Sequence, residues 1–291
     1  MRLLLLFTVS ISVPSAIDTF ADQPPADPSD TARAIAEGHS FTEGPAVADD
    51  GTVYFTDQPN DRVQRITPDG ELSTFLTPAG RSNGLYFAPD GRLIACADGD
   101  NEIWAIDVDT GRHEVLIRQP GGVRLNGPND VWVHPTAGVM FFTDPYYQRP
   151  WWEHDTPPRE TRRVYRADLD GSNVRPVDGD FVQPNGIVGD VDRGRLYVAD
   201  IDAKKTYVYD MAADGELSGR RLFCEMGSDG MTVDDDGNVY LTGQGVTGFD
   251  VDGRQIRHID VPENWTANVT IDPTRSRLII TAMGKVYAAD L

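Results

Sequence analysis

The chain has 291 residues, of which 40% are hydrophobic, so it is long enough to bury the core of one large domain or of two ordinary ones. Its formal net charge of -20 at pH 7 argues against binding to nucleic acid or to anionic membrane surfaces, which are themselves negative. No internal stretch approaches the roughly 18 apolar residues of a membrane-spanning helix, and the many Gly, Pro and Asp-Gly pairs predict short strands and turns.

The first 21 residues have the layout of a secretory signal peptide. One arginine supplies the positive charge, residues 3–13 form the apolar segment, and Ala16 and Ala21 offer cleavage sites. An uncleaved membrane anchor is the alternative interpretation. Residues 22–30 are rich in Pro, Asp and Ala, which is typical of a disordered lead-in. We therefore expect an exported protein, periplasmic or secreted, whose folded part spans residues 31–291.

A repeated unit runs through the rest of the chain. Each unit begins with a polar residue, continues with alternating apolar residues, and passes through a tight turn, such as Asp50-Gly51 or Asp90-Gly91, into a second strand. Successive units start roughly 40 to 56 residues apart, which is the period of a four-stranded propeller blade. Six polar residues open the units: Glu43, Asn83, Asn129, Asn185, Asp229 and Asn268.

The units also predict how the ring closes. A third strand, as at 61–66 or 206–209, and a fourth, as at 71–76, follow the first two strands. The sixth unit stops after its third strand, 285–288, whereas residues 31–37 precede the first unit and can supply the missing outer strand. The sequence therefore predicts an all-β, six-bladed β-propeller closed by an N-terminal strand that completes the last blade. An open sandwich or a barrel would not explain why the same polar position recurs in phase with each unit.

The six unit-opening residues are expected at one mouth of the central channel, because the innermost strands of a propeller converge there. All six carry a carboxylate or amide oxygen, the ligand type of hard divalent cations, whereas the Cys and His that Zn²⁺ prefers are absent from the set. Asn-Gly and Asp-Gly are also common hairpin turns, but their shared phase favours an ion site for the set. We expect one divalent cation, with calcium first and magnesium, manganese or zinc as alternatives.

The insertion at residues 146–162 is the longest departure from the repeat. It contains Tyr147, Trp151 and Trp152, whose aromatic faces suit stacking on a sugar ring. The segment is therefore either a lid or wall over the site or a loop packed on the rim.

Five segments stand in order at specific spacings: 41–45 (FTEGP), 124–130 (RLNGPND), 142–145 (FTDP), 184–187 (PNGI) and 228–231 (SDGM). Together they resemble the gluconolactonase, senescence-marker-protein and luciferin-regenerating-enzyme-like family, and the resemblance extends over essentially all of residues 34–291. It agrees with the propeller that the repeat predicts.

The resemblance implies a lactonase, a carboxylic ester hydrolase that opens lactones of aldonic acids with a single metal, usually calcium. Glu43, Asn185 and Asp229 match the metal ligands, and Asn129 matches a fourth position that binds the metal directly or through water. Asp229 also matches the general base. Because a cation lowers the pKa of a carboxylate that binds it, a role as ligand only is the alternative for Asp229.

The resemblance also implies candidate contacts to the substrate. Arg124 is a candidate for holding it, and Asn126 and Asn129 can each be aligned with the family's asparagine. Where related subfamilies show Glu-His at the end of the second unit's strand, this chain has Ala97-Asp98.

The expected partner is a small sugar lactone. A closed propeller leaves no edge that requires a partner, so a monomer is the default expectation, without nucleic acid and without membrane after cleavage of the signal. Two other functions remain open at this point: a calcium-dependent hydrolase of the phosphotriesterase or arylesterase type, and a carbohydrate-binding propeller without catalysis.

Overall fold

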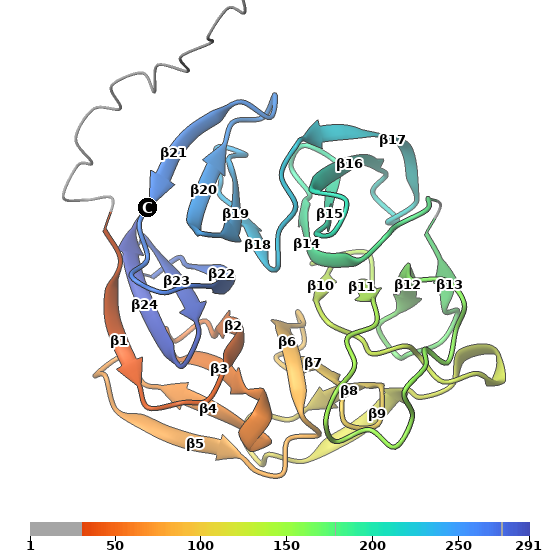
Figure 1. Cartoon of the computed structure of the whole chain (residues 1–291), viewed down its shortest axis with the longest axis horizontal. Helices are drawn as coiled ribbons and strands as arrows, with labels where there is room; N and C mark the ends of the chain where they lie inside the picture. The colour runs from red at the N-terminus through yellow and green to blue at the C-terminus, as the bar shows by residue number, and fades with distance from the viewer. Residues whose placement is uncertain (1–30, 178, 275) are drawn as a thin grey trace, which may run out of the picture.

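A computed structural model describes residues 31–291 apart from 178 and 275, and it has six four-stranded antiparallel sheets arranged around a central axis (Figure 1). The prediction of an all-β, six-bladed propeller is thus confirmed. The only helical segments in the described part are two 3-10 turns, η2 (Gln58–Asn60) and η3 (Pro120–Gly122), and no helix there could cross a membrane. The predicted signal peptide and lead-in, residues 1–30, lie outside the described residues.

The first five blades each run from the channel outward in chain order. Their strands are β2 (Thr42–Val47), β3 (Val53–Asp57), β4 (Arg62–Ile66) and β5 (Leu72–Leu76); β6 (Ser82–Phe87), β7 (Leu93–Ala97), β8 (Glu102–Ile106) and β9 (His113–Ile117); β10 (Val131–Val133), β11 (Val139–Asp144), β12 (Arg163–Asp168) and β13 (Arg175–Pro176); β14 (Pro184–Asp190), β15 (Arg195–Asp200), β16 (Lys205–Met211) and β17 (Leu217–Cys224); β18 (Met231–Val233), β19 (Val239–Gly243), β20 (Gly245–Phe249) and β21 (Gln255–Ile259).

The sixth blade joins the two ends of the described chain. It consists of β22 (Thr266–Asp272), β23 (Arg277–Ala282), β24 (Lys285–Asp290) and, outermost, β1 (Arg33–Glu37). Strand β1 pairs antiparallel with β24, with Ala34 opposite Tyr287 and Glu37 opposite Lys285, and Figure 1 shows the two strands side by side. This pairing is the predicted closure, and it covers an edge that would otherwise be exposed.

The Asp-Gly turns set the register of the strands that they connect. In the second blade, the amide of Gly91 donates to the carbonyl of Ala88 at 2.9 Å, and Gly91 has a φ of +84°. A side chain would be strained in that left-handed conformation, which glycine adopts freely. The turn places Phe87 opposite Leu93, so that the apolar face of both strands points into the core.

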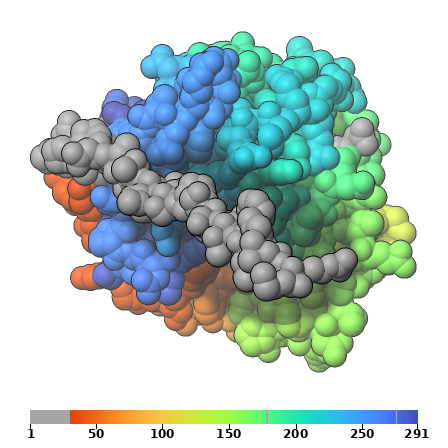
Figure 2. Space-filling view, turned by 45° about the horizontal axis from the view of Figure 1, so that its top comes forward, coloured from red at the N-terminus to blue at the C-terminus, as the bar shows by residue number. Residues whose placement is uncertain are grey.

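Large side chains fill the spaces between neighbouring blades. Trp132 on β10 is 2% exposed, and its indole ring occupies the space where a side chain at Gly189 of β14 would lie. The ring of Phe141 lies 6.0 Å from that of Trp132. Such packing joins β10 to β14 of the next blade and holds these inner strands in fixed positions around the channel. Figure 2 shows neighbouring blades lying against one another where their atoms are coloured on the face that it presents.

Hydrogen bonds also connect neighbouring blades close to the places where the inner strands begin. The hydroxyl of Thr56 donates to the carbonyl of Asn83 at 3.0 Å, and the amide of Gly84 donates to the carbonyl of Asn129 at 2.8 Å. The hydroxyl of Thr242 makes a similar bond to the carbonyl of Ala267 at 2.9 Å. These bonds fix the unit-opening residues relative to one another.

Candidate functional site

A cavity of ≈ 490 Å³ lies at the mouth of the channel where the inner strands begin. Four of the six unit-opening residues line it, together with residues from loops. The lining consists of Phe41, Glu43, Asn83, Asn129, Tyr147, Arg149, Ile201, Asp202, Asp229 and Trp265.

Asp229 differs from the other unit-opening residues in its exposure. The remaining five are buried, whereas Asp229 is partly exposed. It precedes β18 by two residues, in the segment that connects β17 to β18. Asp229 is therefore the acidic member of the set that a small molecule in the mouth can reach.

Two side chains hold the Asp229 carboxylate in place. The indole Nε1 of Trp265 donates to Oδ2 at 2.7 Å, and the Nδ2 of Asn185 donates to Oδ1 at 2.7 Å. Burial raises the pKa of Asp229 to about 6, although these two hydrogen bonds and the charge of Arg149 act in the opposite direction. A carboxylate with such a pKa is deprotonated at neutral pH and retains some basicity.

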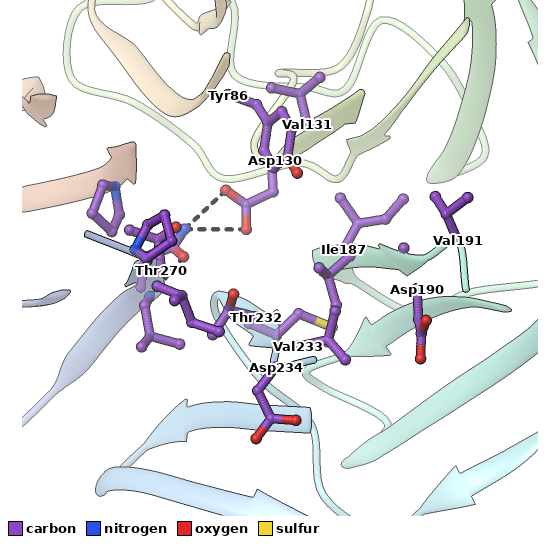
Figure 3. A pocket seen from close by; sticks show the side chains of 18 of the residues that line it. Tyr86, Asp130, Val131, Ile187, Asp190, Val191, Thr232, Val233, Asp234 and Thr270 are labelled. Atoms are coloured by element: carbon purple, nitrogen blue, oxygen red, sulfur yellow. Dashed lines mark hydrogen bonds between the residues drawn. The ribbon is translucent and has the colours of Figure 1, made fainter. Parts of the chain in front are cut away.

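Two further buried carboxyl groups lie close to Asp229. The pKa of Glu43 is raised well above its usual value, first by burial and then by the charges of Asp229 and Asp130. Burial and the charge of Asp229 raise the pKa of Asp130 in the same way. In Figure 3 the dashed lines mark two hydrogen bonds to the Asp130 carboxylate, which the Nδ2 of Asn268 donates at 2.9 and 3.2 Å.

Asn268 differs in position from the rest of the predicted ring. It lines a second cavity of ≈ 380 Å³ further along the channel, which Asp130, Ile187 and Thr232 also line (Figure 3). Its Nδ2 is bonded to Asp130, and its Oδ1 accepts from the amide of Val269 at 2.8 Å. Both polar atoms of its side chain thus have partners within the channel wall.

The donor set at the mouth fits a hard divalent cation. In the part of the chain that the structure describes, no three His, Cys, Asp or Glu side chains are arranged to hold a metal, so amide oxygens must contribute. The Oδ1 atoms of Asn83 and Asn185 are buried without a hydrogen-bond partner, and buried polar atoms normally have one. The negative charge of Asp229 raises the pKa of Glu43, and a nearby cation would offset this repulsion. Oxygen donors of this kind suit Ca²⁺ or Mg²⁺.

The 146–162 insertion supplies part of the wall of the mouth. Tyr147 accepts a hydrogen bond from the Nδ2 of Asn185 at 2.9 Å, and Arg149 lines the cavity. The Nε of Arg149 donates to Oδ2 of Asp98 at 2.7 Å, and the indole of Trp152 donates to the backbone carbonyl of Asp98 at 2.7 Å. The insertion is thus attached to the end of β7, where this chain has aspartate.

The three predicted substrate contacts occupy different places. Asn129 lines the mouth, whereas Arg124 and Asn126 do not. The Oδ1 of Asn126 accepts from the amide of Arg159 at 2.8 Å, and its Nδ2 donates to the carbonyl of Thr161 at 3.1 Å. Asn126 therefore braces the insertion, and Arg149 is the arginine that reaches the mouth.

Six residues near the site have no counterpart among the candidates from the sequence: Phe41, Asp130, Arg149, Ile201, Asp202 and Trp265. Asp130 was adjacent to a candidate, and its carboxylate could have been noted for that reason. Phe41 opens one of the segments that carry the family resemblance. The remaining four reach the mouth from loops that the repeat does not describe, so the repeat carried no spacing signal for them.

Comparison with known proteins identifies the family. The family model described as the SMP-30/gluconolactonase/LRE-like region matches residues 41–284. The chain belongs to this family. It is 27% identical over 246 residues to a gluconolactonase of Zymomonas mobilis, an alignment that covers 75% of this chain and 69% of that protein.

Solved structures of other proteins superpose on this propeller. A gluconolactonase from Xanthomonas campestris is 30% identical, with a TM-score of 0.82 over 89% of this chain and 90% of that chain. Regucalcin from Agrobacterium tumefaciens, described as a calcium-binding protein, has a TM-score of 0.75 at 20% identity, over 89% and 93% of the two chains. The second likeness concerns the fold alone.

Proposed function

We propose that this family member hydrolyses a sugar lactone at the mouth of its channel. The observation that carries the proposal is a partly exposed Asp229 among buried oxygen donors, in a cavity large enough for one sugar ring. Relatives named gluconolactonase, at 27% and 30% identity over most of the chain, support a lactonase.

Glu43, Asn129, Asn185 and Asp229 would hold one divalent cation, for which calcium is our first choice. When bound, such an ion acts as a Lewis acid toward a carbonyl oxygen. The chain's own contribution is to collect these oxygens from four blades and to exclude most solvent from all but Asp229.

Asp229 is the proposed general base. Its carboxylate is held by Trp265 and Asn185, so it cannot rotate away from a water molecule in the mouth. Accepting the proton of that water would assist attack on the lactone carbonyl, and proton transfer of this kind typically contributes about 10²- to 10⁴-fold. The alternative role, as a ligand only, leaves the proton to solvent.

Phe41, Tyr147 and Trp265 form the aromatic part of the mouth. Aromatic faces stack on the C–H face of a sugar ring, and they also accept an aryl group. A hydrolase acting on aryl esters or phosphotriesters therefore remains the second candidate, and a carbohydrate-binding propeller is the third.

Turnover assays with and without chelator distinguish the candidates. Purified protein is given D-glucono-1,5-lactone, phenyl acetate or paraoxon, and Asp229→Asn and the peripheral variant Asp170→Asn are compared. We expect lactone turnover that EDTA abolishes, that added Ca²⁺ restores, and that Asp229→Asn reduces by about 100-fold or more.

Two results would contradict parts of the proposal. Lactone turnover that survives both chelation and Asp229→Asn would exclude the metal site and the base together. Calcium binding by calorimetry without turnover of any of the three substrates would favour the binding protein.

A further inference from the structure

Among the residues that the structure describes, Arg149 is the one basic residue that lines the mouth. Three carboxylates share the lining with it, those of Glu43, Asp202 and Asp229. Its side chain is 19% exposed, so it is largely enclosed and still accessible from the cavity. It lies on the 146–162 insertion, which interrupts the repeat. Its position is therefore set by this insertion and not by the repeated blade pattern.

Only part of the Arg149 guanidinium is used by the protein. Its Nε donates to Asp98 at 2.7 Å, and the Asp98 side chain is 2% exposed. The guanidinium carbon lies 5.5 Å from the centre of the Tyr147 ring and 5.7 Å from that of Trp151. Within residues 31–291, omitting 178 and 275, neither Nη1 nor Nη2 donates a hydrogen bond to another residue.

The immobilised guanidinium therefore offers unused donors in a cavity that is otherwise rich in acceptors. A guanidinium has only donors, in a planar fork that matches a carboxylate with two parallel hydrogen bonds. The carboxylates around the mouth would repel an anionic ligand, and Arg149 opposes this repulsion. Asp98 and the two aromatic rings fix the fork, so little side-chain entropy is lost when a ligand binds.

We propose that Arg149 binds the carboxyl end of the ligand, contacting the acyl oxygen of the lactone and both oxygens of the aldonate that hydrolysis produces. The inference rests on the proposed lactonase function and adds to it a specificity-determining residue and a ligand class, the polyhydroxy carboxylates. Asp98 is a positioning residue in this arrangement, because it holds Nε and contacts no ligand itself.

The test compares two ligands that differ only at the carboxyl end. D-Gluconate has a carboxylate where D-glucitol has a hydroxymethyl group, and the remaining hydroxyl chain is the same. Binding of each is measured by calorimetry, with calcium present throughout, to the wild type and to Arg149→Met. Arg81→Met is the matched control, because Arg81 stacks on the same Trp151 ring at 4.7 Å but lies outside the mouth lining.

We expect the wild type to bind gluconate more tightly than glucitol and Arg149→Met to lose about tenfold or more of gluconate affinity, the usual effect of losing a hydrogen bond to a charged group. Glucitol affinity should change less than twofold, and Arg81→Met should resemble the wild type. Arg149→Lys keeps the charge without the fork, so we expect an intermediate affinity for gluconate. If Arg149→Met does not fold, the gluconate affinity of Arg149→Lys tests the proposal in its place.

Two results would overturn the inference. The first is an unchanged preference for gluconate in Arg149→Met, or in Arg149→Lys if only that variant folds. The second is equal binding of gluconate and glucitol by the wild type. Because the measurement uses no turnover, it is separate from the lactonase assay. A protein that binds gluconate through Arg149 but hydrolyses no lactone would refute the proposed function and leave the carboxylate site standing.

Discussion

Asp98 should make the stability of the fold decrease as the pH rises toward neutrality. Burial raises the pKa of this carboxyl from 3.8 to about 7; Arg149 and Gln58 lower it, and the charge of Asp144 raises it. The native state therefore keeps a proton that the unfolded chain releases at a lower pH. Stability contributed by the protonated form is complete below 3.8 and is lost as the pH rises to about 7.

The size of the effect follows from this difference in proton binding. One proton bound by the native state alone changes the free energy of unfolding by about 1.4 kcal/mol for each pH unit. Asparagine is nearly isosteric with aspartate and does not titrate. The free energy of unfolding of Asp98→Asn, relative to the wild type, should therefore increase by about 2 kcal/mol between about pH 5 and pH 7, because the native carboxyl is half ionised at the upper limit.

Urea unfolding of both proteins at several pH values in this range measures the difference. Differences in packing and hydrogen bonding between asparagine and the protonated acid do not depend on pH, so they shift the two curves by a constant amount and leave the comparison of slopes intact. Asp170→Asn is the control, because Asp170 is exposed and hydrogen bonds from Ser172 lower its pKa, so that it titrates below this range. Parallel curves for Asp98→Asn and the wild type would show that Asp98 is already ionised in the native protein at pH 5.

Three further variants test the site and the packing that supports it. Trp265→Phe keeps an aromatic ring but removes the 2.7 Å hydrogen bond to Asp229. The value of kcat/KM for the lactone should fall about tenfold or more, with the melting temperature little changed. An unchanged kcat/KM would mean that this hydrogen bond does not position the carboxylate. Gly230→Ala would place a methyl group against the side chain of Asn268, which is hydrogen-bonded to Asp130 inside the channel. Calcium affinity, measured by calorimetry, should therefore weaken. An affinity equal to that of the wild type would show that the Asn268 side chain can move without affecting the calcium site. Trp132→Ala would leave a cavity between two blades and should lower the free energy of unfolding in urea by about 3 to 5 kcal/mol, with a loss below 1 kcal/mol indicating that the blades collapse to fill it.

The six blades could be predicted from the sequence because each blade repeats a local pattern. Asp-Gly turns such as Asp90-Gly91 and the alternation of apolar residues are read over a few neighbouring positions, and their period gives the number of blades. The closing strand, β1, could be inferred because the count of strands left one place empty in the last blade. The positions of Glu43 near the start of its inner strand, and of Asn129 and Asp229 two residues before theirs, follow from the same phase.

The rest of the site was decided by the tertiary structure. Arg149 and Trp265 belong to loops of different length in different blades, and only the closure of the ring brings them to one cavity. The choice between Arg124 and Arg149 depends on how the insertion folds back on Asp98, an ion pair between residues 51 positions apart. Asn268 is the predicted residue type at the predicted position of the repeat. Its side-chain amide nevertheless donates a hydrogen bond to Asp130, 138 positions away in the sequence. A repeat specifies which strand a residue begins, whereas the direction of its side chain depends on contacts with distant segments that no local pattern records.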